Sequence, residues 1–267
     1  MMTHLAGYFF CIFIGFSLGL IGGGGSILTI PMLVFFFGID PVMATTYSLF
    51  IVGLTAVSGS IDHYRVRNID YKTVLLFGIP SVIVLFIMRR WLLGLIPPTI
   101  LTVRSLVLSK SLFIMIIFSI TMLVAGGSMV RKKGFTHSPE KLSYARLVLQ
   151  GCITGAITGF IGIGGGFIIV PSLVLFAGLP MKRAIGTSLV IITINCLVGI
   201  LGNLEAVESL NFILLSALAA LAIIGILIGT WSIRFIPDKQ LKPIFGWIIL
   251  VLSAVIFVRI FLEHLYR

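Results

Sequence analysis

The chain has 267 residues, of which 59% are hydrophobic and 10% are charged, and its mean hydropathy is +1.21. A soluble domain of this size keeps about a quarter of its surface in water, so it could not hide this many apolar side chains. Soluble enzymes and nucleic-acid-binding proteins are therefore excluded. The net charge of +11 lies in short Lys and Arg clusters between apolar runs, as the positive-inside pattern of membrane proteins explains without nucleic acid.

An internal repeat begins near the N-terminus. Residues 15–31 read GFSLGLIGGGGSILTIP, and residues 155–171 read GAITGFIGIGGGFIIVP. The residues reproduced at an offset of 140 are Gly15, Gly19, Gly22, Gly24, Gly25 and Pro31. The offset continues without a gap through Ser48 and Ser188, so the sequence indicates two copies of one unit.

Apolar runs near the length of about 20 residues that crosses a bilayer follow in chain order. In the first copy they are 7–37, 42–61, 71–88 and 105–130, and in the second they are 147–177, 183–201, 209–233 and 243–262. We expect an all-α membrane protein, a polytopic helical bundle of two homologous halves. The first transmembrane repeat is 1–130, a polar loop follows at 131–146, and the second repeat is 147–267.

The first apolar run of each copy is interrupted by glycines, GGGG at 22–25 and GIGGG at 162–166. Consecutive glycines break a helix, so each run is either a tilted helix with an unwound centre or a re-entrant hairpin. Hairpins place about two thirds of the 19 Lys and Arg residues on one side of the membrane, whereas crossing helices divide them almost evenly. The positive-inside rule favours hairpins. Three crossings would then remain in each copy, which predicts an inverted repeat.

The apolar runs lack the groups that metal sites and catalysis need. All carboxylates and histidines fall in loops or near segment ends. Metal-cation transport and intramembrane catalysis are therefore not expected, and no cofactor is implied. Cys11, Cys152 and Cys196 form no CxxC pair. His63, at the end of the second run, is predicted to be a hydrated interfacial group in preference to a proton-coupling group.

Two uses of the glycine runs stay open, close helix packing or an anion site, and the broken-helix pattern favours the anion site. Helices that start after such runs present unpaired N–H groups and partial positive charge. Shared elements at 44–48 and 184–188 either cap their own helices or offer hydroxyl donors, and Asn195 either bonds across helices or lines the path. The candidate substrate-binding residues are Gly22, Gly23, Gly24, Gly25, Ser26, Thr45, Thr46, Ser48, Gly162, Gly164, Gly165, Gly166, Thr187, Ser188 and Asn195.

Three further glycine pairs have a spacing that predicts close helix packing. They are Gly15 with Gly19, Gly155 with Gly159, and Gly225 with Gly229, each a small-xxx-small pattern. Such a pattern lets two helix backbones approach closely without any ligand.

Together, the two glycine-rich segments, the elements that follow them and the duplication resemble the sulfite exporter TauE/SafE family, also called 4-toluene sulfonate uptake permeases. The resemblance covers nearly the whole chain. It implies a multi-pass carrier of the bacterial inner membrane for sulfite, sulfoacetate or other sulfonates. Tyr47 stands where the second copy has Thr187, and Ser26 stands opposite Gly166, so the halves of the site are expected to be unequal.

We therefore predict a secondary carrier, not an enzyme, that moves a small oxyanion across a lipid bilayer by alternating access. Export of a sulfite dianion needs no coupled ion, because a negative-inside potential favours it by about 2.3 kcal/mol per charge per 100 mV. A channel and a membrane assembly or redox component without a transported solute are the alternatives. The direction, the coupling ion and the oligomeric state, a homo-oligomer included, stay open.

Overall fold

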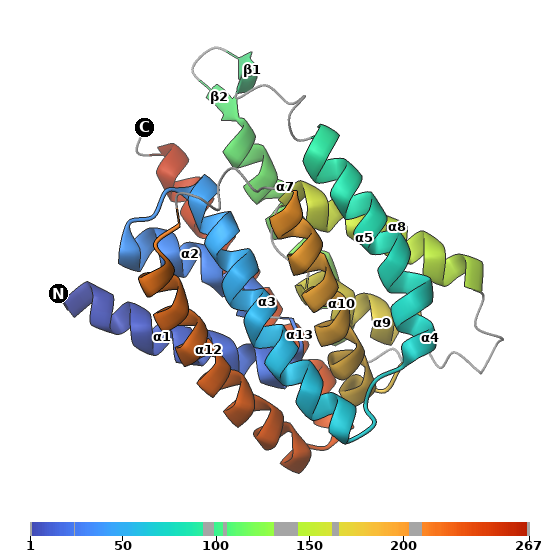
Figure 1. Ribbon diagram of the computed structural model, residues 1–267. Coiled ribbons are helices and arrows are strands. Elements are labelled where there is room, and N and C mark those ends of the chain that lie inside the picture. Colours follow the sequence, from blue (N-terminus) through green and yellow to red (C-terminus); the bar gives the residue numbers. More distant parts are fainter. Residues whose placement is uncertain are drawn as a thin grey trace.

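The structure is a computed structural model that describes residues 2–23, 25–92, 99–103, 106–130, 144–161, 166–202 and 210–265 (Figure 1). Most of these residues are helical. The longer helices are α1 (Met2–Ile21), α2 (Gly25–Phe37), α3 (Pro41–Arg65), α5 (Ile79–Ile87), α7 (Lys110–Val130), α8 (Tyr144–Ile161), α9 (Gly166–Leu175), α10 (Met181–Leu201), α12 (Phe212–Ser232) and α13 (Asp238–Leu265).

The helical membrane class is confirmed. Among the described residues, three stretches are long and apolar enough to cross a membrane, namely Met43–Arg65, Met181–Leu201 and Phe212–Phe235. Large apolar side chains also cover the outside of the bundle: Phe9 is 75% exposed and Ile213 is 84% exposed. Such a surface suits lipid tails, whereas in water it would be a strong aggregation site.

Two segments differ from the predicted helices. Residues 106–109 lie in the fourth predicted run, yet they form strand β2 (Leu106–Ser109), which pairs antiparallel with β1 (Thr99–Val103) before α7 begins. Residues 71–92 were expected as one regular helix at 71–88, but they form α4 (Tyr71–Thr73), α5 and two π-helical turns, η1 (Val74–Gly78) and η2 (Met88–Leu92). Pro80 in the first turn of α5 has no N–H to donate to the preceding turn, which favours the widened helix before it.

Helices α1 and α2 run antiparallel. A Cβ on Gly7 would lie 2.6 Å from the ring of Phe37, and the rings of Tyr8 and Phe37 have centroids 5.3 Å apart. Along a continuous helix, thirty residues would span about 45 Å. In the second half, the hydroxyls of Thr154 on α8 and Ser172 on α9 lie 3.5 Å apart, whereas eighteen helical residues span about 27 Å. The chain therefore reverses in both halves.

Helices from the two copies of the sequence repeat pack on each other, since α1 packs along α12 and α8 packs along α5. A Cβ on Gly15 would lie 2.9 Å from Cα of Ala222, and one on Gly229 would lie 3.0 Å from Cα of Gly19. A Cβ on Gly155 would meet Cα of Ser81 at 2.8 Å. The packing role predicted for the three small-xxx-small pairs is confirmed, since a side chain at these positions would force neighbouring backbones apart.

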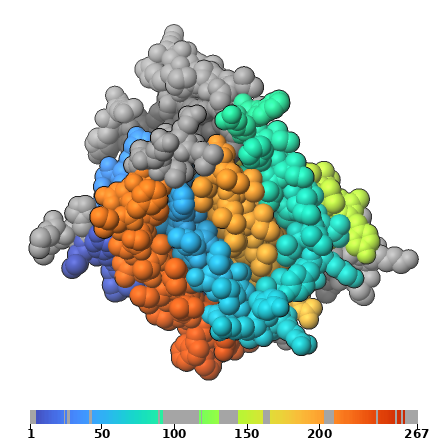
Figure 2. Space-filling model, in the orientation of Figure 1, coloured from blue at the N-terminus to red at the C-terminus, as the bar shows by residue number. Residues whose placement is uncertain are grey.

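The repeat-related helices α3 and α10 pack against each other in antiparallel orientation. A Cβ on Gly53 would lie 3.0 Å from Cβ of Cys196, and one on Gly186 would lie 2.9 Å from Nδ1 of His63. The related pair α7 and α13 is antiparallel too, because Ser119 bonds Ser253 while Gly126 packs on Gly246. Figure 2 shows the order α12, α3, α10, α5 and α8 across one face, so helices of the two halves alternate there.

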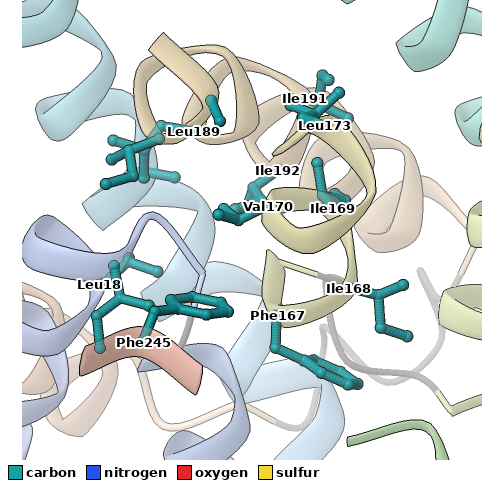
Figure 3. Packing of buried hydrophobic residues seen from close by; sticks show 14 of the residues in the cluster. Leu18, Phe167, Ile168, Ile169, Val170, Leu173, Leu189, Ile191, Ile192 and Phe245 are labelled. Atoms are coloured by element: carbon teal, nitrogen blue, oxygen red, sulfur yellow. The ribbon is translucent and has the colours of Figure 1, made fainter. Parts of the chain in front are cut away.

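The core is built where α9 and α10 meet α1 and α13. Figure 3 shows Leu18 of α1 and Phe245 of α13 on one side of the ring of Phe167, which is fully buried. Ile169, Val170 and Leu173 of α9 belong to the same cluster as Leu189, Ile191 and Ile192 of α10. Apolar packing therefore encloses α9, the short helix that begins at the second glycine run.

Candidate functional site

The two glycine runs meet in the structure. Gly23 and Gly166 are in backbone contact: a Cβ on Gly23 would lie 2.7 Å from Cα of Gly166, and closer still to its carbonyl group. A Cβ on Gly166 would lie 2.6 Å from Cα of Gly23 and 2.7 Å from Cδ1 of Ile192. Any side chain at position 23 or 166 would collide with the backbone of the other segment. Because both residues are glycines, two backbone segments that are 143 positions apart in the sequence can touch here.

The first glycine run also contacts α10 of the opposite half. Gly22 has φ of +71°, a conformation that favours glycine, and its N–H donates to the carbonyl of Leu18 at 2.7 Å. The hydroxyl of Ser188 donates to the carbonyl of Gly22 at 2.7 Å and also lies 2.7 Å from the carbonyl of Ile185. Ser188, predicted as a substrate ligand, thus holds the tip of the α1–α2 pair against α10.

Thr187 and Tyr47 occupy equivalent positions in the repeat, and the hydroxyl of each accepts a hydrogen bond from a backbone N–H of the other half. Thr187 Oγ1 accepts from the backbone N–H of Asp70 at 3.0 Å, and Asp70 caps the N-terminus of α4. The Tyr47 hydroxyl accepts from the backbone N–H of Asn211 at 2.6 Å, and Asn211 caps α12. Each hydroxyl therefore holds the start of a helix from the other half. The local-capping alternative does not apply to α10, whose N-cap is Pro180 without a side-chain bond.

Two buried polar side chains of the predicted site have no hydrogen-bond partner in the part of the chain that the structure describes. Ser48 Oγ on α3 and both amide atoms of Asn195 on α10 are of this kind, and these residues are 1% and 0% exposed. Ser188, Ile192 and Asn195 recur at four- and three-residue spacing, so they share one helix face. This face contacts both glycine runs through Ser188 and Ile192. An unpaired buried amide is costly, so Asn195 remains a candidate for binding a ligand atom.

The remaining predicted residues fall into three groups. Gly25 and Ser26 form the first turn of α2, and a Cβ on Gly25 would lie 2.9 Å from Cβ of Leu18. Thr46 on α3 is fully buried and Thr45 beside it is partly buried; both take part in interactions within the fold. The predicted residues outside the described ranges are Gly24, Gly162, Gly164 and Gly165.

The chemistry available around the glycine contact is that of neutral donors. Helices α2 and α9 both begin where the runs approach each other, at Gly25 and Gly166. Free N–H groups at such helix starts favour anions. Within the described ranges, the buried polar side chains are hydroxyls, one amide and one imidazole, and no group of metal-ligating residues occurs there.

The prediction that His63 is hydrated is wrong. The side chain of His63 is 2% exposed, and neither ring nitrogen has a partner among the described residues. The reason lies in tertiary packing, because Gly186 of α10 leaves room for the ring beside its backbone. The glycine in the AIGTS element of the second half, where the first half has Thr46, was the available signal.

The apolar helical bundle is that of a membrane protein, and the relatives that this chain resembles carry the name of membrane transporters. The "Probable membrane transporter protein" of Xylella fastidiosa strain 9a5c is 30% identical over 66% of this chain, and the match spans 64% of that relative's length. That of Methanocaldococcus jannaschii is 30% identical over 73% of the chain and 72% of the relative. "Probable membrane transporter protein YjnA" of Bacillus subtilis is 28% identical over 90% of the chain and 94% of the relative.

The family is shown by a model described as "Sulfite exporter TauE/SafE", which matches residues 8–256. The chain belongs to this family, as its glycine motifs predicted. No solved structure matches the chain significantly.

Proposed function

We propose that the protein carries a small sulfur-containing oxyanion, such as sulfite, sulfoacetate or another sulfonate, across a bacterial inner membrane by alternating access. The backbone contact between Gly23 and Gly166 carries this proposal. It sets two helix starts from opposite halves next to each other in a core without a buried cation among the described residues. Amide and hydroxyl donors bind the oxygen atoms of an anion without trapping it as a lysine would.

The proposed binding residues are those of the two runs and of the helix faces beside them. Ser48 and Asn195 donate to the anion, since their polar atoms have no partner in the described structure. Ser188 positions the first run through Gly22, and Thr187 acts through Asp70 instead of touching the anion. The two halves of the site are therefore unequal, and Asn195 has Thr55 at its equivalent place in the repeat, whose hydroxyl bonds the carbonyl of Ile51.

The proposed architecture is an inverted repeat with two re-entrant hairpins, α1–α2 and α8–α9. Two observations support it: the helices of each pair are antiparallel, and the repeat-related helices α3 and α10 are antiparallel to each other. The proposed inverted repeat relates the two halves by an approximate two-fold axis perpendicular to α3 and α10. Rocking one half against the other then exposes the tips alternately to the two sides.

Counterflow in liposomes tests the proposal. Purified protein is reconstituted into vesicles loaded with unlabelled sulfite, thiosulfate or an organosulfonate, and uptake of the labelled anion is followed. We expect one of the three to exchange, and Asn195→Leu to slow that exchange at least tenfold. Folded wild-type protein that exchanges none of them refutes the oxyanion function. Single-channel conductance in planar bilayers would instead identify a channel.

A further inference from the structure

His63 lies at the end of α3, where the start of α10 crosses it. Nδ1 of the ring lies 2.9 Å from the position that a Cβ of Gly186 would take, so the ring is pressed against the backbone of α10. The segment after α3 folds back over His63, because the N–H of Asn68 donates to the carbonyl of His63 at 2.9 Å. A Cβ on Gly186 would also meet the carbonyl of Asn68. The ring is enclosed on these sides by backbone.

The side chain of His63 is buried, with 2% of its surface exposed, and neither ring nitrogen has a hydrogen-bond partner in the described structure. Burying a neutral imidazole without hydrogen bonds is costly, and burying an imidazolium without a partner costs far more. Such a group is unfavourable as structural filler at this place. An imidazole titrates near neutral pH, so this ring is a candidate for proton binding when the site opens.

The charged groups near the ring do not form a ready partner for an imidazolium. Asp62, the neighbour of His63 in the chain, accepts a hydrogen bond from Thr230 of α12 at 3.0 Å, and Arg234 of η3 (Ile233–Phe235) places a positive charge nearby. The other charged groups on the elements that pack here are Arg65, Arg67, Asp70, Lys182 and Arg183. The carboxylate of Asp62 favours a charged ring and the guanidinium of Arg234 opposes it, and neither forms a hydrogen bond with the ring in the described structure. A protonated ring therefore requires water and hence separation of the helices.

We propose that His63 is a proton-binding site whose protonation is coupled to separation of the end of α3 from the start of α10. The ring takes its proton from the adjacent aqueous phase when the helices part, and it returns the proton before they close again. Ile185 and Ser188, which touch Gly22, flank Gly186 on α10. The movement that hydrates the ring therefore loosens the first glycine run, and proton binding and anion access are linked.

Hydrogen exchange provides a test that does not depend on transport. Amide exchange of residues 66–70 and 181–186 is measured at pH 7.5 and 5.5 and corrected for the chemical exchange rate. We expect protection in the wild type to fall at least tenfold at pH 5.5. In His63→Gln and His63→Leu, which cannot take up the proton, protection should be the same at both pH values. Residues 119–130 of α7 serve as the internal control.

Two results overturn the proposal: an equal pH response in the variants, or no response in the wild type. If either variant does not fold, the other still decides the question, because one keeps polarity and the other keeps apolar volume.

A second measurement concerns coupling, and this part rests on the proposed function. Vesicles that exchange labelled thiosulfate, whose charge is constant between pH 5.5 and 7.5, are given a pH gradient. We expect the wild type to accumulate the anion, and His63→Gln to exchange it without accumulation. Exchange that ignores the gradient in the wild type refutes proton coupling and leaves the transport function intact. Absence of any exchange refutes the transport function, while hydrogen exchange still decides whether His63 binds a proton.

Discussion

Replacing Gly23 by alanine tests whether the contact between the glycine runs is the working part of the transporter. The added Cβ would lie 2.7 Å from Cα of Gly166, and ordinary contact begins near 3.4 Å, so the two backbones must separate by at least 0.7 Å. Overpacking of this kind costs about 1–3 kcal/mol. If that cost falls on the state in which the tips touch, transport slows by about 5- to 150-fold, since each 1.4 kcal/mol is tenfold.

Counterflow rate and thermal unfolding are measured together for Gly23→Ala and for a control, Gly127→Ala. Gly127 lies inside α7, and a Cβ there would meet nothing within 4 Å. Alanine favours a helix over glycine by about 1 kcal/mol, so the control should be as stable as the wild type or more stable and should transport normally. Wild-type transport by Gly23→Ala would refute the reasoning, because close approach of the runs would then be dispensable.

Three further substitutions separate the site from the scaffold. Asn195→Leu should keep or raise the unfolding temperature, because it removes an unpaired buried amide that destabilises the fold by about 1–3 kcal/mol. The counterflow rate should fall. A fall in both the unfolding temperature and the counterflow rate would show that the amide is structural. Tyr47→Phe should lower stability by about 1 kcal/mol through loss of its bond to the N-terminus of α12, and unchanged thermal unfolding would contradict that role. Gly155→Ala should destabilise the α8–α5 contact by about 1–3 kcal/mol, measured by the same unfolding assay, with wild-type stability as the contrary result.

The sequence predicted the helical segments well because apolar length is a local property. The second segment of each half, for example, was expected at 42–61 and 183–201 and is found as α3 and α10. Gly15 and Gly155 were assigned to packing from their spacing alone, and both lie against a helix of the opposite half. The strands at 99–103 and 106–109 were missed, because apolar stretches of this length, rich in Leu and Val, are compatible with either helix or strand.

The site was harder to predict because its parts come from both halves. Thr187 is the clearest case: its residue type suggested an anion ligand, yet its hydroxyl bonds Asp70, 117 residues away. His63 is the opposite case, since only the position of Gly186 decides that the ring is buried. Both depend on how α3 and α10 cross, and a local pattern does not encode the crossing of two helices.

Tyr47 and Thr187 show why the repeat constrains function more than either copy does. One is an aromatic residue and the other a small alcohol, but each places a hydroxyl on the N–H of a residue that caps a helix of the other half. The role is therefore the same in the two copies, although the residue type is not. α3 and α10 are antiparallel, so the two bonds lie at opposite ends of the pair. In the proposed alternating-access cycle, we expect these two bonds to break in turn, since each holds a helix start at one end of the α3–α10 pair.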